Sequence, residues 1–149
     1  MAGSNVFATA ANARGIPGAP VDFFDSNAGT ETKLTTTPAA VVTDATGKYT
    51  ATIPGMRADG TAVNLVVKVR SENSASRIGP VGIGADATLV YKKASTPTPV
   101  NAAAMTVALL VDNTNLTLLG AFALLEGIVT ARDFVVNNNS GQEWALRLP

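Results

Sequence analysis

The 149-residue sequence contains no histidine and no cysteine. The lack of imidazole excludes a Ser-His-Asp triad, a histidine general base and a histidine metal ligand. The lack of thiols excludes a cysteine nucleophile, a thiolate metal site and a disulfide. Enzyme chemistry would have to use carboxylates, lysine, tyrosine or hydroxyl groups, whereas histidine is the most frequent general acid or base. We therefore predict a protein that is not an enzyme and that needs neither a cofactor nor a metal ion.

Charge is also scarce, because charged residues make up 15% of the chain and 11 basic residues balance 11 acidic ones. A net charge of zero gives no electrostatic reason to bind nucleic acid, and it allows copies of the chain to approach one another closely. The sequence has no uninterrupted run of 18 apolar residues. Its most apolar stretch, 105–129, is broken by polar residues at 112–115 and by Glu126. We therefore predict no membrane span.

The first two thirds of the chain have the pattern of an all-β domain, in which short β-prone runs alternate with glycine, proline, asparagine and aspartate. Asp44–Gly47 is the clearest turn, because the aspartate can cap it and the glycine can adopt a positive φ. This pattern predicts a β-sandwich over residues 1–94. The expected strands are 21–25, 48–53, 62–69 and 87–91, with an edge strand or two short pieces over 33–42, around Pro38.

Two stretches of this region carry a family resemblance. Gly15–Val21, followed by Thr43–Thr50 with its Thr-Asp-x-x-Gly-x-Tyr hairpin, resembles the carboxypeptidase-regulatory-like and Cna-B-type domains of bacterial surface proteins. The resemblance implies an immunoglobulin or prealbumin-like sandwich and an extracellular or cell-surface location, with a virion as the alternative. It assigns no ligand and no site residue.

The composition of the sequence changes after residue 94. Residues 95–104 are rich in proline and threonine and read as a stiff linker. Residues 105–149 form an apolar extension, in which the polar residues at 112–115 predict the turn of a hairpin. Residues 120–136 have helical periodicity, and the asparagines that follow predict the end of that helix. A short apolar run fits helix or strand, so the conformation of 105–119 stays open.

Three patterns that resemble functional motifs are interpreted as structural. Asp22 and Asp25 do not form a facing carboxylate pair, because side chains three apart on a strand point to opposite faces. Residues 25–31 resemble the start of a calcium loop but lack its glutamate at position twelve, so we interpret them as a polar turn. Residues 79–84 are rich in glycine but lack the lysine of a phosphate loop.

The apolar extension is the most informative feature for function. It folds back over the sandwich, or it packs on a neighbouring subunit, because exposed apolar patches mark association sites. We take the second interpretation, a homo-oligomer or polymer acting as the subunit of a bacterial filament, sheath or surface layer. The alternatives are an accessory binding or adhesion domain and a phage capsid decoration or tail protein. The expected interface residues are Leu109, Val111, Leu118, Phe122, Leu125, Val129 and Trp144.

Overall fold

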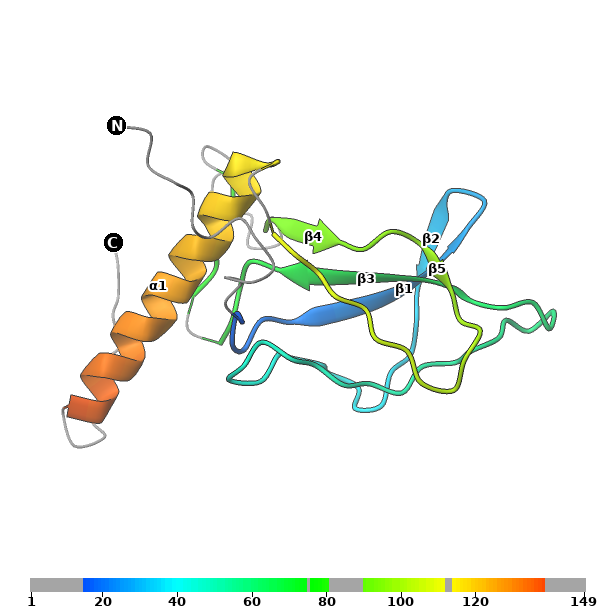
Figure 1. The fold of residues 1–149 in the computed structure, drawn as a ribbon, viewed down its shortest axis with the longest axis horizontal. Helices are drawn as coiled ribbons and strands as arrows, with labels where there is room; N and C mark the ends of the chain where they lie inside the picture. The colour runs from blue at the N-terminus through cyan, green and yellow to red at the C-terminus, as the bar shows by residue number, and fades with distance from the viewer. Residues whose placement is uncertain (1–14, 75, 81–89, 112–113, 139–149) are drawn as a thin grey trace.

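The computed structural model describes residues 15–74, 76–80, 90–111 and 114–138. These residues form an antiparallel sheet followed by one helix (Figure 1). In chain order the elements are β1 (Val21–Asn27), β2 (Thr30–Lys33), β3 (Asn64–Arg70), β4 (Lys92–Ala94), β5 (Thr98–Pro99) and α1 (Leu116–Asn138). The strand order is β2-β1-β3-β4, and β5 also pairs with β3. The protein is therefore mainly β with a C-terminal helix, as predicted.

The centre of the sheet is the antiparallel pair of β1 and β3, in which Phe23 lies opposite Val67 and Val21 opposite Val69. The alternating burial of β1 places Val21, Phe23 and Asp25 on the inner face and Asp22, Phe24 and Ser26 on the outer face. β3 is more continuously apolar, and its residues Leu65–Val67 are all buried. The predictions of strands at 21–25 and 62–69 are confirmed, because the observed strands overlap them closely.

A tight hairpin joins β1 to β2, within the range 25–31 that the sequence predicts as a polar turn. Asn27 pairs with Thr30 across Ala28 and Gly29, whose φ angles are 48° and 81°. Two consecutive positive φ angles define the turn that best matches the twist of a two-residue hairpin. The predicted turn is present but confined to Ala28 and Gly29; its tightness was not evident because glycine occupies only the second turn position, and alanine at the first rarely adopts a positive φ.

Two further turns share one conformation. In the first, the amide of Asp44 donates to the carbonyl of Lys48 and that of Gly47 donates to Asp44, with a φ of 77° at Gly47. In the second, Arg57 donates to Thr61 and Gly60 donates to Arg57, with a φ of 80° at Gly60. The predicted turn at 44–47 is confirmed, and the Asp44 carboxylate caps it by accepting the Thr46 and Lys48 amides.

Extended segments without regular pairing cover the inner face of the sheet. In the segment 48–53, Tyr49, Ala51 and Ile53 point toward the core, as predicted, but its ladder is reduced to a bridge between Thr37 and Thr52. Among the described residues, the backbone of 101–111 makes a single hydrogen bond, which the carbonyl of Val107 accepts from the Tyr49 hydroxyl. Side-chain packing therefore contributes more than backbone hydrogen bonding to holding this second layer against the sheet.

Two predictions for the C-terminal third differ from the structure. The segment 95–104 is not a free linker, because β5 pairs with β3 and the Val100 amide donates to Val63. No hairpin forms around 112–115 in the described residues, since Asn115 instead caps α1 by accepting the Leu118 amide. Asparagine serves both turns and helix N-termini, so its presence alone did not distinguish them. The helix predicted over 120–136 is confirmed and begins earlier, at Leu116.

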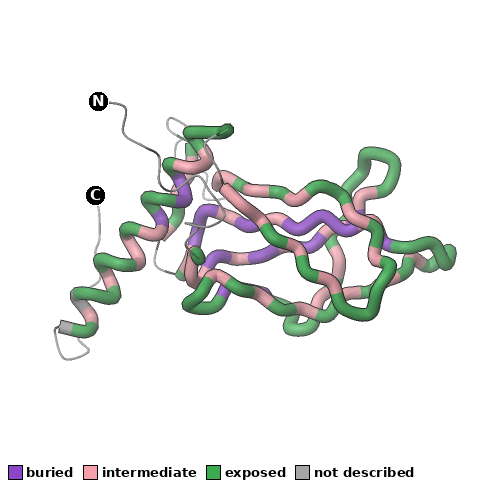
Figure 2. Tube along the Cα trace, viewed as in Figure 1, coloured by how far each residue is buried: buried purple, intermediate pink, exposed green. Residues whose placement is uncertain are grey.

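The hydrophobic core joins the inner face of the sheet to the start of the helix. It contains Ala19, Val21, Phe23, Val41, Val63, Leu65, Val67, Val69 and Phe122. Figures 1 and 2 show α1 across the end of the sheet where β1 begins and β3 ends, with its C-terminal half extending beyond the sheet. After Leu125, no α1 residue whose side chain the structure describes is buried. The helix is thus docked by its N-terminal half.

Candidate functional site

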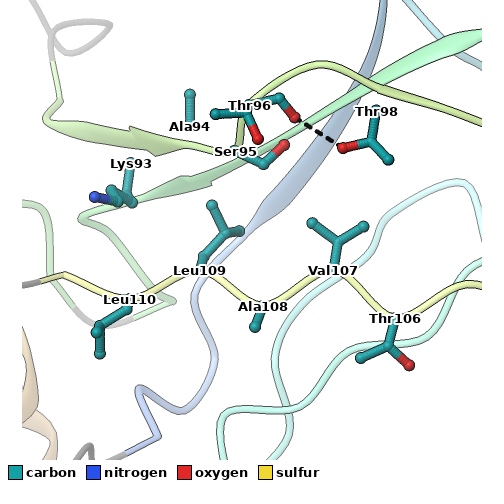
Figure 3. A pocket seen from close by; sticks show the side chains of 10 residues that line it. All are labelled: Lys93, Ala94, Ser95, Thr96, Thr98, Thr106, Val107, Ala108, Leu109 and Leu110. Carbon is teal, nitrogen blue, oxygen red and sulfur yellow. Dashed lines mark hydrogen bonds between the residues drawn. The ribbon is translucent and has the colours of Figure 1, made fainter. Parts of the chain in front are cut away.

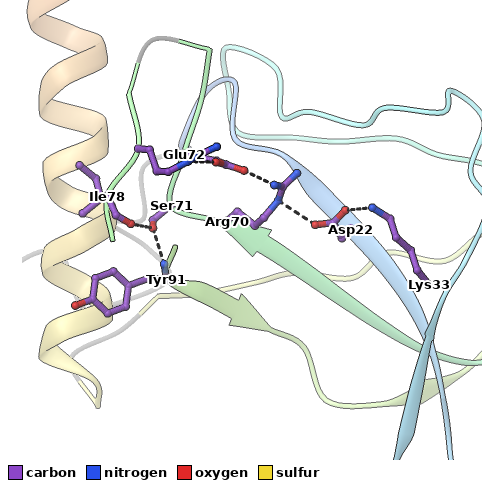
Figure 4. Close-up of polar contacts among 8 residues, drawn as sticks. Asp22, Lys33, Arg70, Ser71, Glu72, Ile78 and Tyr91 are labelled. Carbon is purple, nitrogen blue, oxygen red and sulfur yellow. Dashed lines mark hydrogen bonds and ion pairs between the residues drawn. The ribbon is translucent and has the colours of Figure 1, made fainter. Parts of the chain in front are cut away.

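The outer face of the sheet carries a chain of ion pairs (Figure 4). Asp22 on β1 accepts from Lys33 at 2.6 Å and lies 3.0 Å from the Nε of Arg70. Arg70 also pairs with Glu72, which in turn contacts Arg77 at 2.7 Å. Each carboxylate in this series of ion pairs, Asp22 and Glu72, is therefore paired with two cationic side chains.

Asp25 lies on the opposite face of β1 from Asp22, as the alternation of strand residues predicted. The Arg57 guanidinium makes two bonds to its carboxylate, both 2.5 Å long, and the Asn64 amide donates a third at 2.9 Å. The bonds from Arg57, with that from Asn64, hold the pKa of Asp25 below its usual value. Asp25 is thus a charged structural anchor between the sheet and the 57–61 turn.

A cavity of about 960 Å³ lies between the inner face of the sheet and the second layer. Its floor is formed by Phe23, Leu65, Val67 and Val69 of β1 and β3. Its walls are the segments 48–53 and 102–109, and Phe122 of α1 closes one end. A volume of several hundred Å³ with an apolar lining is typical of sites for small ligands.

Among the described residues, the charged ones that line the cavity are Lys48 and Lys93. Lys93 lies opposite Val69 in the register of β4 with β3, so it belongs to the inner, apolar face of the sheet. Lys48 is exposed, and its backbone amide donates to the Asp44 carboxylate. Within the part of the chain that the structure describes, Lys93 contacts no carboxylate, in contrast to the paired cations Arg57 and Lys68. Lys93 therefore places a positive charge without an ion-pair partner on the inner face of the sheet.

A side groove of about 420 Å³ opens next to this cavity, between the chain around β4 and β5 and the segment 106–110 (Figure 3). Lys93, Val107 and Leu109 line both hollows. Ser95, Thr96 and Thr98 supply hydroxyl groups on one side of the groove. Lys93 therefore stands where the groove meets the cavity.

Tyr49 connects the two segments of the second layer. Its hydroxyl donates to the Val107 carbonyl at 2.6 Å, and its ring meets Phe23 edge to face with 5.9 Å between centroids. Burial raises the pKa of Tyr49 above 10.0. This hydrogen bond is the single polar tether between the described segment 101–111 and the rest of the layer.

We expect Tyr49→Phe to lower the free energy of unfolding by about 1 kcal/mol, because the Val107 carbonyl loses its partner. The stabilisation by the hydroxyl is complete below pH 10 and is lost as the pH rises through the raised pKa of Tyr49. Urea unfolding between pH 7 and pH 11 measures both effects. Tyr91→Phe is the matched control, because the Tyr91 hydroxyl makes no hydrogen bond in the described structure. Equal losses for both variants would contradict the tether.

The outer face of α1 is apolar along its length. Six residues spaced three or four apart are all exposed and all apolar or small: Leu116, Gly120, Leu124, Gly127, Ala131 and Phe134. We call this set the outer stripe. Leu116, Leu124 and Phe134 are exposed to 68%, 54% and 68%. Among the described helices, none has the length and apolar character required to cross a membrane.

The residues expected to form an interface lie mainly on the inner side of the extension. Phe122 and Leu125 are buried, at 2% and 0% exposure. Leu109, Val111 and Leu118 are partly buried against the core, and Val129 is half-buried. Trp144 lies outside the described residues. Leu109, Val111, Leu118 and Phe122 therefore pack with the protein's own core.

The outer stripe and Lys93 were not singled out from the sequence. The spacing of the stripe was visible, but the helix was expected to start at residue 120, so Leu116 fell outside it. Lys93 followed the predicted strand at 87–91, of which 87–89 lie outside the described residues, and its face depends on the register with β3. Comparisons with protein-family models, curated proteins and solved structures found no match for this chain.

Proposed function

We propose that this chain is a non-enzymatic structural subunit that self-associates through the outer stripe of α1. The observation that carries the proposal is the exposure of Leu116 and Leu124 on one helix face. Large apolar side chains aligned on a solvent-facing helix are typical of an association surface. The partner we propose is a second copy, because the stripe contains no charge and the net charge of the chain is zero.

The stripe is complementary to itself when two helices run antiparallel. Placing the two-fold axis between Leu124 and Gly127 sets each Leu124 against the glycine of the other copy. The same axis brings Leu116 near the other copy's Phe134 and sets Gly120 against Ala131. A large residue facing a small one allows two helices to approach closely, and such a two-fold pair uses the same patch on both subunits. The paired length from Leu116 to Phe134 is about 27 Å at ~1.5 Å per residue.

We further propose that the sheet and the segments 48–53 and 101–111 correspond to the two layers of an immunoglobulin or prealbumin-like sandwich. Supporting this, residues at alternate positions of both segments point toward the sheet. The setting we propose is the outside of a bacterial cell, in a filament, sheath or surface layer. In that setting the sheet would be the body of the subunit and α1 its connector.

The test is sedimentation velocity of the full chain over a wide range of concentration. We expect the mass to rise from the 15.2 kDa monomer toward at least twice that value. Leu124→Glu will weaken association by about a hundredfold or more, because an unpaired carboxylate in an apolar interface costs several kcal/mol. The matched control is Met56→Glu, a charge introduced at an apolar side chain that is 70% exposed and lies outside α1, in the bridge that Met56 forms with Ala62.

Two results would contradict the proposal. A wild-type chain that stays monomeric up to millimolar concentration has no self-association to explain. Equal weakening by Leu124→Glu and Met56→Glu would show that association is not located on α1. Circular dichroism of both variants checks that the helix and the sheet are retained.

A further inference from the structure

The inner cavity takes no part in the proposed self-association of α1, and its lining combines apolar side chains with a lysine. Its floor is apolar, its walls combine apolar residues with threonines, and Lys93 is the lysine on its inner face. Lys33 and Lys68 of the sheet pair with Asp22 and Glu31, whereas Lys93, half-buried, has no carboxylate partner among the described residues. A cation on an apolar face without a carboxylate partner is costly unless a ligand or water supplies the counter-charge.

We propose that the cavity binds a single-chain anionic amphiphile, a long alkyl chain with a terminal carboxylate. The alkyl chain lies against Tyr49, Ile53 and Leu109, the partly exposed apolar side chains of the walls, where burying each methylene contributes about 0.8 kcal/mol. The carboxylate lies beside Lys93, at the junction of the cavity with the side groove. The hydroxyl groups of Ser95 and Thr96 line the same groove (Figure 3) and suit a hydrated carboxylate.

The position of Lys93 explains why an anion is favoured over a neutral or cationic amphiphile. Lys92 and Lys93 are neighbours on β4, but their side chains point to opposite faces of the sheet. Lys93 is half-buried on the inner face, whereas Lys92 is exposed on the outer face. The two lysines therefore provide an internal comparison, because they share the same strand and the same chemistry and differ in the face they occupy.

The test is isothermal titration of the full chain with dodecanoate, dodecanol and dodecyltrimethylammonium, each below its micelle concentration. We expect dodecanoate to bind tightest and the ammonium compound at least about tenfold more weakly, because its charge opposes that of both lysines. Lys93→Gln will weaken dodecanoate binding about threefold to fivefold, the effect of losing one partly exposed charge pair. Dodecanol binding will not change in this variant.

Lys92→Gln is the control and will bind dodecanoate like the wild type. Ala51→Phe fills part of the cavity and will abolish binding of all three probes, provided that circular dichroism shows a folded protein. Absence of dodecanoate binding to the folded wild type would overturn the proposal. So would equal binding of the anionic and cationic probes, or equal effects of Lys92→Gln and Lys93→Gln. Retention of the chain on phosphatidylglycerol vesicles without binding of free dodecanoate would assign the surface to a membrane and also overturn it.

Discussion

Gly47→Ala will destabilise the fold by about 3 kcal/mol or more, several times the effect of the same change at Gly60. A Cβ atom at Gly47 would lie 2.3 Å from the Cα of Gly15 and 2.8 Å from the amide nitrogen of Ile16. These are backbone atoms, so no side-chain rotation relieves the clash. The segment after Gly15 is also held in place, because Thr43 donates to the Ile16 carbonyl and accepts from the Ala19 amide.

Gly60 separates this steric effect from the cost of the backbone conformation. It occupies the same position in the second of the two matching turns, with a φ of 80° against 77° at Gly47. No atom lies within 4 Å of the Cβ that alanine would place there. Gly60→Ala therefore costs only the strain of a positive φ, about 1 kcal/mol. Urea unfolding of the two variants measures the difference, and equal losses would show that Gly15 and Gly47 are not in contact.

Leu125→Ala will lower the free energy of unfolding by about 3 kcal/mol, whereas Leu124→Ala will change it by less than about 0.5 kcal/mol. The two leucines are neighbours on α1, but Leu125 is fully buried and Leu124 is 54% exposed. Removing the buried side chain leaves a cavity where the helix is docked. Removing the exposed one affects only the outer stripe.

The same pair of variants separates folding from association. Unfolding is measured at low concentration, where the chain is monomeric, and sedimentation is measured at high concentration. We expect Leu124→Ala to weaken self-association while it leaves the monomer stable. If Leu124→Ala destabilises the monomer as much as Leu125→Ala does, the outer stripe is covered by the chain itself, and the proposed subunit contact is lost with it.

Much of the fold followed from local patterns in the sequence. The alternation in 21–25, the dense β-branched run of 62–69 and the Asp-x-x-Gly turn each correspond to an observed feature. The periodicity of 120–136 predicted the helix. Local patterns suffice for these elements because the signal and the structure arise from the same few neighbouring residues.

The remaining features depend on tertiary contacts that no local pattern contains. The proline-rich segment reads as a linker, yet β5 is an edge strand, where proline is tolerated because the missing amide costs no ladder bond. The segments 48–53 and 101–111 have the side-chain alternation of strands but lack regular partners, so the pattern overstated their pairing. The sequence shows that Lys93 is charged, but it does not show which face of the sheet the side chain occupies. That face is determined by the pairing of Lys93 with Val69 of β3.

The sparse backbone bonding of 101–111 gives the molecule two parts of unequal stiffness. The sheet is the stiffer part, because backbone hydrogen bonds pair β1, β2, β3 and β4 residue by residue. The segment 101–111 lies over the sheet with few hydrogen bonds. The backbone bond from Val100 to Val63 holds its start, and the hydrogen bond from the Tyr49 hydroxyl to Val107 holds its middle. Separating this segment from the sheet would leave the strand pairing intact and break one side-chain hydrogen bond, but it would also remove Val107, Leu109 and Val111 from the core. The free-energy cost of opening this layer is therefore set by apolar contacts and not by hydrogen bonds.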